Sequence, residues 1–202
     1  MMPGLLEKTA EKIPEKIDKK NGYHSDKYIA SIGTEGYKIA VENLAAINSP
    51  TEFTNIGPEH AAIVFGNIFK TAKDYVKIYT GNFSGDISNK DYYLNNLKSL
   101  LRRHIPISII FQNDPNEHSL ALAALEEFSN SKNISLRKLI KFQDVFQNHF
   151  TIADNRMYRM ETSVTNYEAE CSFNGPDTVN TLDKVFSYLI AFSEVYQKPV
   201  AA

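Results

Sequence analysis

The stretch that decides the fold of this chain is residues 147–174, QNHFTIADNRMYRMETSVTNYEAECSFN. It begins with two short runs of strand-forming residues, 149–153 and 156–161. Asp154 and Asn155 lie between them, and both residue types tolerate the positive φ that a tight hairpin turn requires. These residues therefore predict a β-hairpin.

A third strand and a helix are expected directly after the hairpin. Residues 168–173 again have the pattern of a strand. The Asn-Gly-Pro-Asp sequence at 174–177 ends this strand, and its proline suits the first turn of a helix. The hairpin and the third strand are thus expected to form one antiparallel unit.

Helical and strand patterns alternate along the preceding part of the chain. Helices are expected at 34–47, 57–72, 92–101, 117–129 and 176–196, strands at 75–83, 105–111 and 134–140, and an edge strand or extended lead-in at 52–56. Such alternation requires crossover connections between parallel strands. We therefore expect an α/β fold with a mixed central sheet and helices on both faces.

The length of 202 residues fits one domain, or one domain with an N-terminal extension. We expect residues 1–54 to be an extension with one amphipathic helix and residues 55–198 to be the domain. No apolar run approaches the roughly 20 residues that span a bilayer, and the charged N-terminal segment lacks a secretory signal. The sequence therefore predicts no membrane span and a cytoplasmic location. Cys171, the only cysteine, is expected to be a buried strand thiol.

The charge and the motifs exclude several classes of function. A formal net charge of −2 argues against a surface devoted to nucleic acid. The five histidines and the single cysteine lack the spacing of metal ligands, so no metal is expected. No phosphate-binding loop, dinucleotide fingerprint or Ser-His-Asp motif is present, and no cofactor is expected.

Three segments resemble the phospholipase D superfamily, whose domain is an α/β/α sandwich. They are AAIVFGNIFKTAKDYVKIYTGNFSG at 61–85, LKSLLRRHIPISIIFQ at 97–112 and NYEAECSFNGPDTVNTLDKVFSYL at 166–189. The first is similar to the family's opening helix and strand, the second to its next helix and strand, and the third to its Asn-x-Glu strand and final helix. The resemblance covers about residues 55–195 and implies a phosphodiesterase fold.

The family's diagnostic HxKxxxxD motif is not intact in this chain. Matching histidine to histidine puts Thr151 at the lysine position and Arg156 at the aspartate position. Matching the hairpin turn instead puts Asp154 at the aspartate position, Gln147 at the nucleophilic histidine and His149 at the lysine. The second register is favoured because the length of the hairpin fixes which residues face each other across it, whereas a single side chain is easily replaced.

The resemblance implies roles for the remaining polar residues if chemistry survives. His149 would be the catalytic nucleophile, with Arg156 or Arg159 supplying the positive charge for phosphate. Asn166 would take the place of the asparagine in the family's Gly-Ser-x-Asn segment, or would belong with Glu168 to the Asn-x-Glu strand. Glu161, Glu168 and Asp154 are expected to have supporting roles.

The same residues have a purely structural interpretation. Arg159 and Glu161 lie two apart on one strand and therefore share a face, where they can form an ion pair. A buried arginine requires a carboxylate, so Arg159 is expected to pair with Glu161 or Glu168. His149 is expected to form a hydrogen bond with Glu161 or Tyr158.

Three hypotheses for function follow. The leading one is a phospholipase D-like domain without catalysis that acts as a binding or regulatory module. The rival is an atypical phosphodiesterase or nuclease in which a two-fold homodimer brings two copies of His149 together to act on a nucleic acid or another phosphate-bearing ligand. The third is a scaffold whose N-terminal Lys/Glu segment docks on a protein partner.

Overall fold

The computed structural model describes residues 33–128, 132–140 and 148–197. The helices are α3 (Gly33–Ala46), α4 (Gly57–Thr71), α5 (Asp91–Arg102), α6 (Leu120–Glu127) and α7 (Pro176–Ala191). The strands are β1 (Phe53–Asn55), β2 (Val76–Thr80), β3 (Ile107–Phe111), β4 (Ile134–Leu139), β5 (Phe150–Ala153), β6 (Met157–Ser163), β7 (Glu168–Ser172) and β8 (Ser193–Val195).

The eight strands in the described part of the chain form one mixed sheet with the order β1-β7-β6-β5-β2-β3-β4-β8. Strands β2, β3 and β4 are parallel, as expected for strands joined by helical crossovers. The hairpin β5–β6 and strand β7 are antiparallel and join the sheet through pairing of β5 with β2. The prediction of a mixed sheet extended by the hairpin is confirmed.

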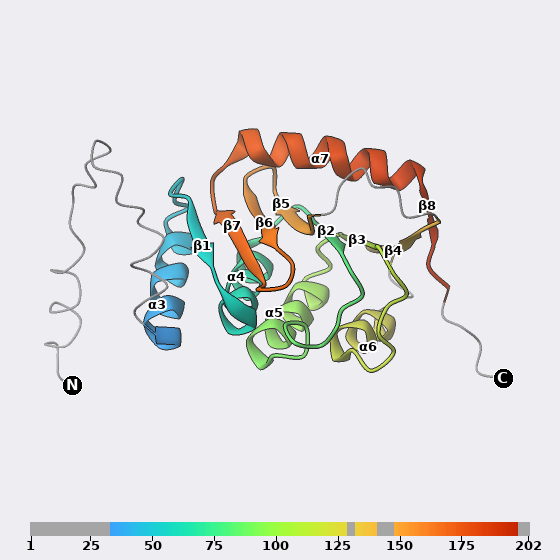
Figure 1. Cartoon of the computed structure of the whole chain (residues 1–202), viewed down its shortest axis with the longest axis horizontal. Coiled ribbons are helices and arrows are strands. Elements are labelled where there is room, and N and C mark those ends of the chain that lie inside the picture. Colours follow the sequence, from blue (N-terminus) through green and yellow to red (C-terminus); the bar gives the residue numbers. More distant parts are fainter. Residues whose placement is uncertain (1–32, 129–131, 141–147, 198–202) are drawn as a thin grey trace, which may run out of the picture.

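Helices cover both faces of the sheet (Figure 1). Helices α4 and α5 pack against one face, and α3 packs on α4. Of the helices described, α7 lies along the opposite face, where Val179, Leu182 and Phe186 contact apolar strand residues such as Ile110 and Ile152. The sheet thus separates two apolar cores, and the predicted α/β/α sandwich is confirmed.

The structure differs from the sequence-based expectation at the ends of two elements. The last predicted helix, 176–196, ends at Ala191, and the chain then forms β8 beside β4. Phe173, expected in the sheet, follows the last residue of β7. Residues 53–55, left open between strand and lead-in, form the edge strand β1. A short edge strand has little sequence pattern of its own, so the sequence did not predict β8.

The hairpin turn forms at the predicted residues. Asp154 and Asn155 have φ angles of 54° and 55°, and the Arg156 amide donates to the Ala153 carbonyl over 3.1 Å. Both residues are therefore in the left-handed conformation that the sequence predicted.

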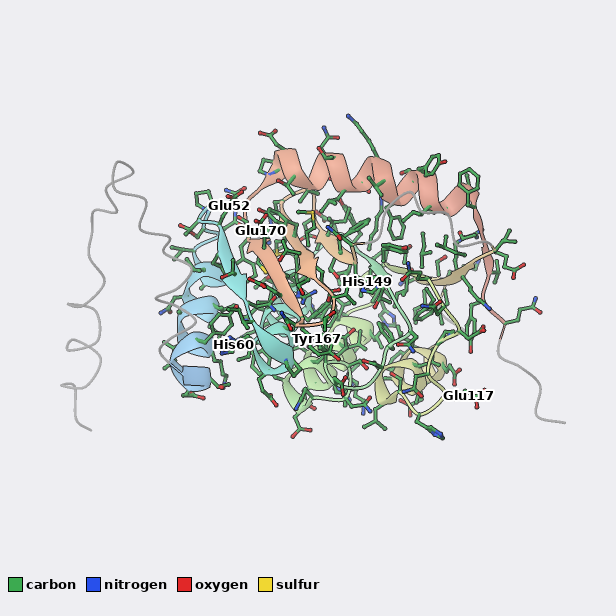
Figure 2. The ribbon with its side chains drawn as sticks, in the orientation of Figure 1. Glu52, His60, Glu117, His149, Tyr167 and Glu170 are labelled. Atoms are coloured by element: carbon green, nitrogen blue, oxygen red, sulfur yellow. The ribbon has the colours of Figure 1, made fainter. Side chains whose placement is uncertain are left out.

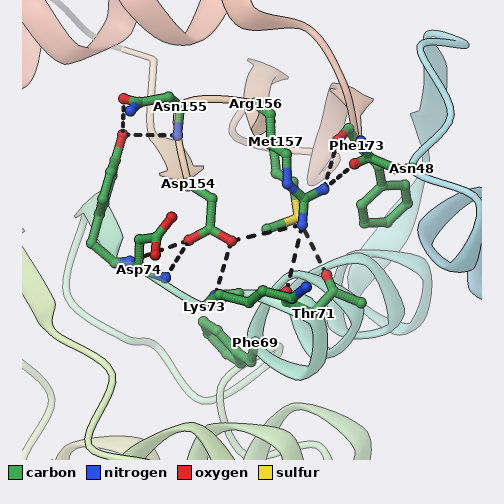
Figure 3. Close-up of polar contacts among 12 residues, drawn as sticks. Asn48, Phe69, Thr71, Lys73, Asp74, Asp154, Asn155, Arg156, Met157 and Phe173 are labelled. Atoms are coloured by element: carbon green, nitrogen blue, oxygen red, sulfur yellow. Dashed lines mark hydrogen bonds and ion pairs between the residues drawn. The ribbon is translucent and has the colours of Figure 1, made fainter.

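Asp154 also fixes the connection between α4 and β2 (Figure 3). Its carboxylate accepts hydrogen bonds from the amides of Lys73 (2.9 Å), Asp74 (2.9 Å) and Tyr75 (3.2 Å). These three amides follow the helix end and point to a side chain that is only 4% exposed. The turn of the hairpin therefore anchors the start of the central strand.

Cys171 is completely buried in β7, as predicted. Burial raises the pKa of its thiol to about 12. A protonated, inaccessible thiol is a poor nucleophile.

We predict that Asp154→Gly lowers the free energy of unfolding by about 2 kcal/mol, because three amides lose a charged acceptor. Glycine permits the positive φ, so the loss reports the carboxylate and not backbone strain. The control is Asn155→Gly in the same turn, which removes one neutral hydrogen bond from the Tyr75 hydroxyl and should cost about 1 kcal/mol. Chemical denaturation measures both, and equal effects of the two variants would contradict the anchoring role.

Candidate functional site

A cluster of polar side chains lies where the parallel strands β2 and β3 end. His149, Arg159 and Glu161 come from the two strands of the hairpin, and Gln112 follows β3. The carboxyl ends of parallel strands are the usual place for a binding site in an α/β fold. Figure 2 shows His149 within the fold, below α7.

Arg159 is almost completely buried, with 1% of its surface exposed. Its three nitrogen atoms donate to the Glu161 carboxylate (3.0 Å), the Asn55 side-chain oxygen (3.0 Å) and the Tyr167 carbonyl (3.3 Å). The guanidinium also lies 4.9 Å from the ring centre of Phe65 on α4. Arg159 therefore joins β1, β6, the β6–β7 turn and α4 through one side chain. The predicted pairing of Arg159 with a carboxylate is confirmed.

Glu161 links Arg159 to His149. One carboxylate oxygen accepts from Arg159, and the other lies 2.8 Å from Nδ1 of His149. Burial alone would raise the pKa of Glu161, but the hydrogen bond with His149 and the charge of Arg159 together lower it. Glu161 is therefore ionised at neutral pH and balances the charge of Arg159.

Both ring nitrogens of His149 have partners. Nδ1 contacts Glu161, and Nε2 lies 3.1 Å from the side-chain oxygen of Gln112. The ring also packs edge-on against Tyr79, with 5.8 Å between ring centres. At Gly81 an added Cβ would lie 3.2 Å from the His149 ring, so the absence of a side chain there leaves the imidazole its space. The predicted hydrogen bond between His149 and Glu161 is confirmed.

A pocket of about 220 Å³ adjoins this cluster. Its wall includes His149, Thr151, Arg159 and Glu161 from the hairpin. The remaining wall residues come from α4, β2 and the segment after it, α5, β5 and the β6–β7 turn: Phe65, Tyr79, Thr80, Gly81, Asn82, Phe83, Ser84, Ile87, Ser88, Tyr93, Phe150, Val164 and Tyr167. The wall combines aromatic side chains with polar residues and one ion pair.

Other residues assigned to the site from the sequence lie elsewhere. Arg156 is beside the hairpin turn, where it contacts Asn48, the Phe173 carbonyl and Asp154 (Figure 3). It is thus at the opposite end of β5 from His149.

The two residues of the Asn-x-Glu element also lie outside the polar cluster. The Asn166 side chain is exposed in the β6–β7 turn, and its carbonyl accepts from the Gly57 amide over 3.1 Å. Glu168 begins β7 and is half-buried. Neither residue borders the pocket. Gln147, at the family's nucleophile position, lies outside the described residues.

Four residues of the site were not assigned to it from the sequence: Asn55, Gln112, Thr151 and Tyr167. The sequence places Thr151 only at the lysine position of the HxKxxxxD motif, in one of the two registers. Gln112 carried a usable signal, because it directly follows a buried parallel strand. Asn55 and Tyr167 carried none, since β1 is only three residues long and Tyr167 lies in a turn.

Neither a metal centre nor a membrane helix is found in the part of the chain that the structure describes. No group of three His, Cys, Asp or Glu side chains among those residues is arranged to hold a metal ion. None of the helices described is long and apolar enough to cross a bilayer.

Comparison with known proteins places this fold among phospholipase D-like structures. No protein-family model and no curated protein matches the sequence. The phospholipase D family member Nuc from Salmonella typhimurium matches with 18% identity, over 73% of this chain and 100% of that chain, with a TM-score of 0.54. NucT from Helicobacter pylori matches with 13% identity over 72% and 99% of the two chains, also with a TM-score of 0.54.

A third similar structure is that of an archaeal chromatin protein, TrmBL2, described as having a novel mode of DNA binding. It matches with 11% identity and a TM-score of 0.54, over 80% of this chain and 62% of that one. At these identities the similarities establish the fold alone. The chain therefore has a phospholipase D-like fold, as its sequence resemblance implied.

We predict that Arg159→Met lowers the free energy of unfolding by about 3–5 kcal/mol, because Glu161 becomes a buried charge without its cation. The double variant Arg159→Met/Glu161→Gln should lose less than the single variant, since no unpaired carboxylate remains. Arg156→Met, at the partly exposed hairpin turn, is the control, with an expected loss of about 1 kcal/mol. Denaturant unfolding of the three variants tests this, and a double variant less stable than Arg159→Met would contradict it.

The lowered pKa of Glu161 predicts a dependence of stability on pH. Its folded pKa lies below the ordinary value of 4.5, so its ionisation stabilises the folded state above that pH. This stabilisation is lost as the pH falls through the folded pKa. The difference in unfolding free energy between the wild type and Glu161→Gln should therefore be largest near neutral pH and narrow on acidification below about pH 4.5. A difference independent of pH would contradict this.

Proposed function

We propose that this chain is a phospholipase D-like domain without phosphodiesterase activity, acting as a binding or regulatory module. The observation that supports this most directly is the internal use of the polar cluster. Each nitrogen of Arg159 already donates to a protein group, and both ring nitrogens of His149 have partners. These contacts are all made within the protein and need no substrate.

The electrostatics of the pocket support the same proposal. Stabilising a phosphoryl group requires cations aimed at its oxygen atoms. Arg159 is the one lysine or arginine among the described residues that line the pocket, and Glu161 neutralises it. A phosphate placed there would face the Glu161 carboxylate, and this repulsion opposes both binding and transition-state stabilisation.

One of the proteins with a similar fold is described by the nucleic acid that it binds. TrmBL2 is described as an archaeal chromatin protein with a novel mode of DNA binding, whereas another similar structure is that of a phosphatidylserine synthase from Haemophilus influenzae. A binding role for this chain is consistent with the first of these. A cytoplasmic location is part of the proposal. Docking of the N-terminal Lys/Glu segment on a protein partner stays a separate hypothesis, and that segment lies outside the described residues.

The rival function, a phosphodiesterase or nuclease built on His149, has one observation in its favour. The His149 side chain remains 15% exposed at the pocket, and its Nδ1 faces a carboxylate, an arrangement that can orient a catalytic imidazole. One copy of the chain supplies one such histidine. This function therefore requires a homodimer that brings two pockets together.

We predict that the purified protein does not hydrolyse bis(p-nitrophenyl) phosphate or single-stranded DNA above the rate of the buffer. His149→Ala should give the same background, because no phosphoryl transfer depends on the imidazole. Turnover that is abolished in His149→Ala and retained in the exposed-residue control Glu170→Ala would overturn the proposal. Turnover that persists in both variants identifies a contaminating enzyme.

Sedimentation at micromolar concentration tests the rival function separately. The proposal of a binding module makes no demand on the oligomeric state, whereas the phosphodiesterase requires a dimer. A monomer would exclude the dimeric site. A dimer with His149-dependent turnover would establish the rival.

A further inference from the structure

His60 on α4 is stacked against a tyrosine of α3. Its imidazole lies nearly parallel to the Tyr37 ring, with 3.9 Å between the ring centres and 7° between the planes. Tyr37 is completely buried, and its hydroxyl donates to the Thr54 carbonyl of β1 over 3.1 Å. The stack is therefore part of the contact that joins α3 to the rest of the fold.

The Nδ1 atom of His60 is buried and has no hydrogen-bond partner among the described residues. A neutral imidazole fits this arrangement, because one of its two nitrogens carries a lone pair and no proton. An imidazolium carries a proton on each nitrogen, so Nδ1 would become a buried, charged donor without an acceptor. The geometry of the stack therefore favours the neutral ring over the charged one.

The position of His60 in its helix acts in the same direction. The residue lies in the first turn of α4, which begins at Gly57, and the free amides of a helix N-terminus disfavour a positive charge. Burial lowers the pKa of His60 below its ordinary value of 6.5, and the neighbouring Glu59 carboxylate only opposes this shift. Three independent features thus disfavour protonation of His60 while α3 is in place.

The charged groups around the stack do not compensate for a proton on His60. From α3, Tyr37 faces the imidazole as a neutral phenol, because burial raises the pKa of its hydroxyl. Glu59 is exposed and pairs with Lys90, which precedes α5. On the strands packed against α4, the charges of Arg159 and Glu161 on β6 pair with each other, and β1 has no titratable side chain.

Helix α3 lies at the edge of the fold, beside β1 and α4 (Figure 1). Figure 2 shows His60 next to this helix. Besides the stack, α3 contributes the buried apolar residues Val41 and Ala45, and its Glu42 accepts a hydrogen bond from the Tyr92 hydroxyl over 2.7 Å. Since α3 contributes no strand to the sheet, it can move away while the strands stay paired.

We propose that the His60–Tyr37 stack is a pH-sensitive latch that holds α3 on α4. At neutral pH the imidazole is uncharged and the latch is closed. As the pH falls below about 6.5, the ordinary value for histidine, the imidazole gains a proton wherever α3 has moved away, and the opened state is favoured. Opening uncovers the side of α4 on which α3 packs. This regulation goes beyond the proposed function and does not rest on it.

Hydrogen exchange of the full-length protein at pH 7.5 and pH 5.5 tests the latch. A ring that is neutral in the closed state and has the ordinary pKa of 6.5 in the opened state favours opening by up to about tenfold at pH 5.5 relative to pH 7.5. After correction for intrinsic rates, we expect the α3 amides to exchange about three to ten times faster at pH 5.5. The α5 amides should show no such change. Both pH values lie above the range in which Glu161 loses its charge.

His60→Phe keeps an aromatic ring against Tyr37 and removes the titration, so the corrected exchange of α3 should be equal at the two pH values. The matched control is His118→Phe at an exposed position, which should keep the response of the wild type. A response in His60→Phe as large as that of the wild type, or no response in the wild type, would overturn the proposal.

Titration of the His60 ring signals in the wild type by nuclear magnetic resonance is an independent measurement that needs no variant. A midpoint below pH 6.5 is expected. A midpoint at or above pH 6.5 would overturn the latch even if His60→Phe did not fold. Neither result bears on the hydrolysis of bis(p-nitrophenyl) phosphate, so failure of the latch and failure of the proposed function are distinguishable.

Discussion

The buried ion pair of Arg159 and Glu161 is the interaction on which the rest of this structure depends. A guanidinium with 1% of its surface exposed must be matched by acceptors, and the fold provides them from the end of β1, from β6 and from the β6–β7 turn. Phe65 of α4 covers its face. Because this one buried charge must be satisfied, β1, the hairpin and α4 are held in one arrangement.

The same requirement explains why a phospholipase D-like fold can retain polar residues at the site without the chemistry. Phosphoryl transfer needs a nucleophile and cations whose hydrogen bonds are free to meet a substrate. Here the cation is used by Glu161, and Glu161 in turn holds His149. A role in stability is therefore enough to explain the polar residues that resemble remnants of a catalytic site.

The sequence predicted the fold more completely than the site. The alternation of strand and helix patterns predicted the mixed sheet, because buried parallel strands such as 107–111 and the turn at Asp154 have strong local signals. The pairing of Arg159 with Glu161 was predictable because residues two apart on a strand share a face. The sequence could not show that Arg159 borders the pocket and Arg156 does not. The end of a hairpin that borders a pocket is decided by the neighbouring strands. Asn55 is 104 residues from its partner Arg159 in the sequence, and only the assembled sheet brings the two residues together.

The most direct test of this account is the effect of inorganic phosphate on the melting temperature of the wild-type protein, with chloride at equal ionic strength as the reference. A molecule that binds only the folded state raises the melting temperature in proportion to its occupancy. Because Arg159 is paired with Glu161 and both ring nitrogens of His149 contact protein groups, the account predicts equal melting temperatures in phosphate and chloride. A saturable rise in phosphate that disappears in His149→Ala would show that the cluster is an anion site and would contradict the account.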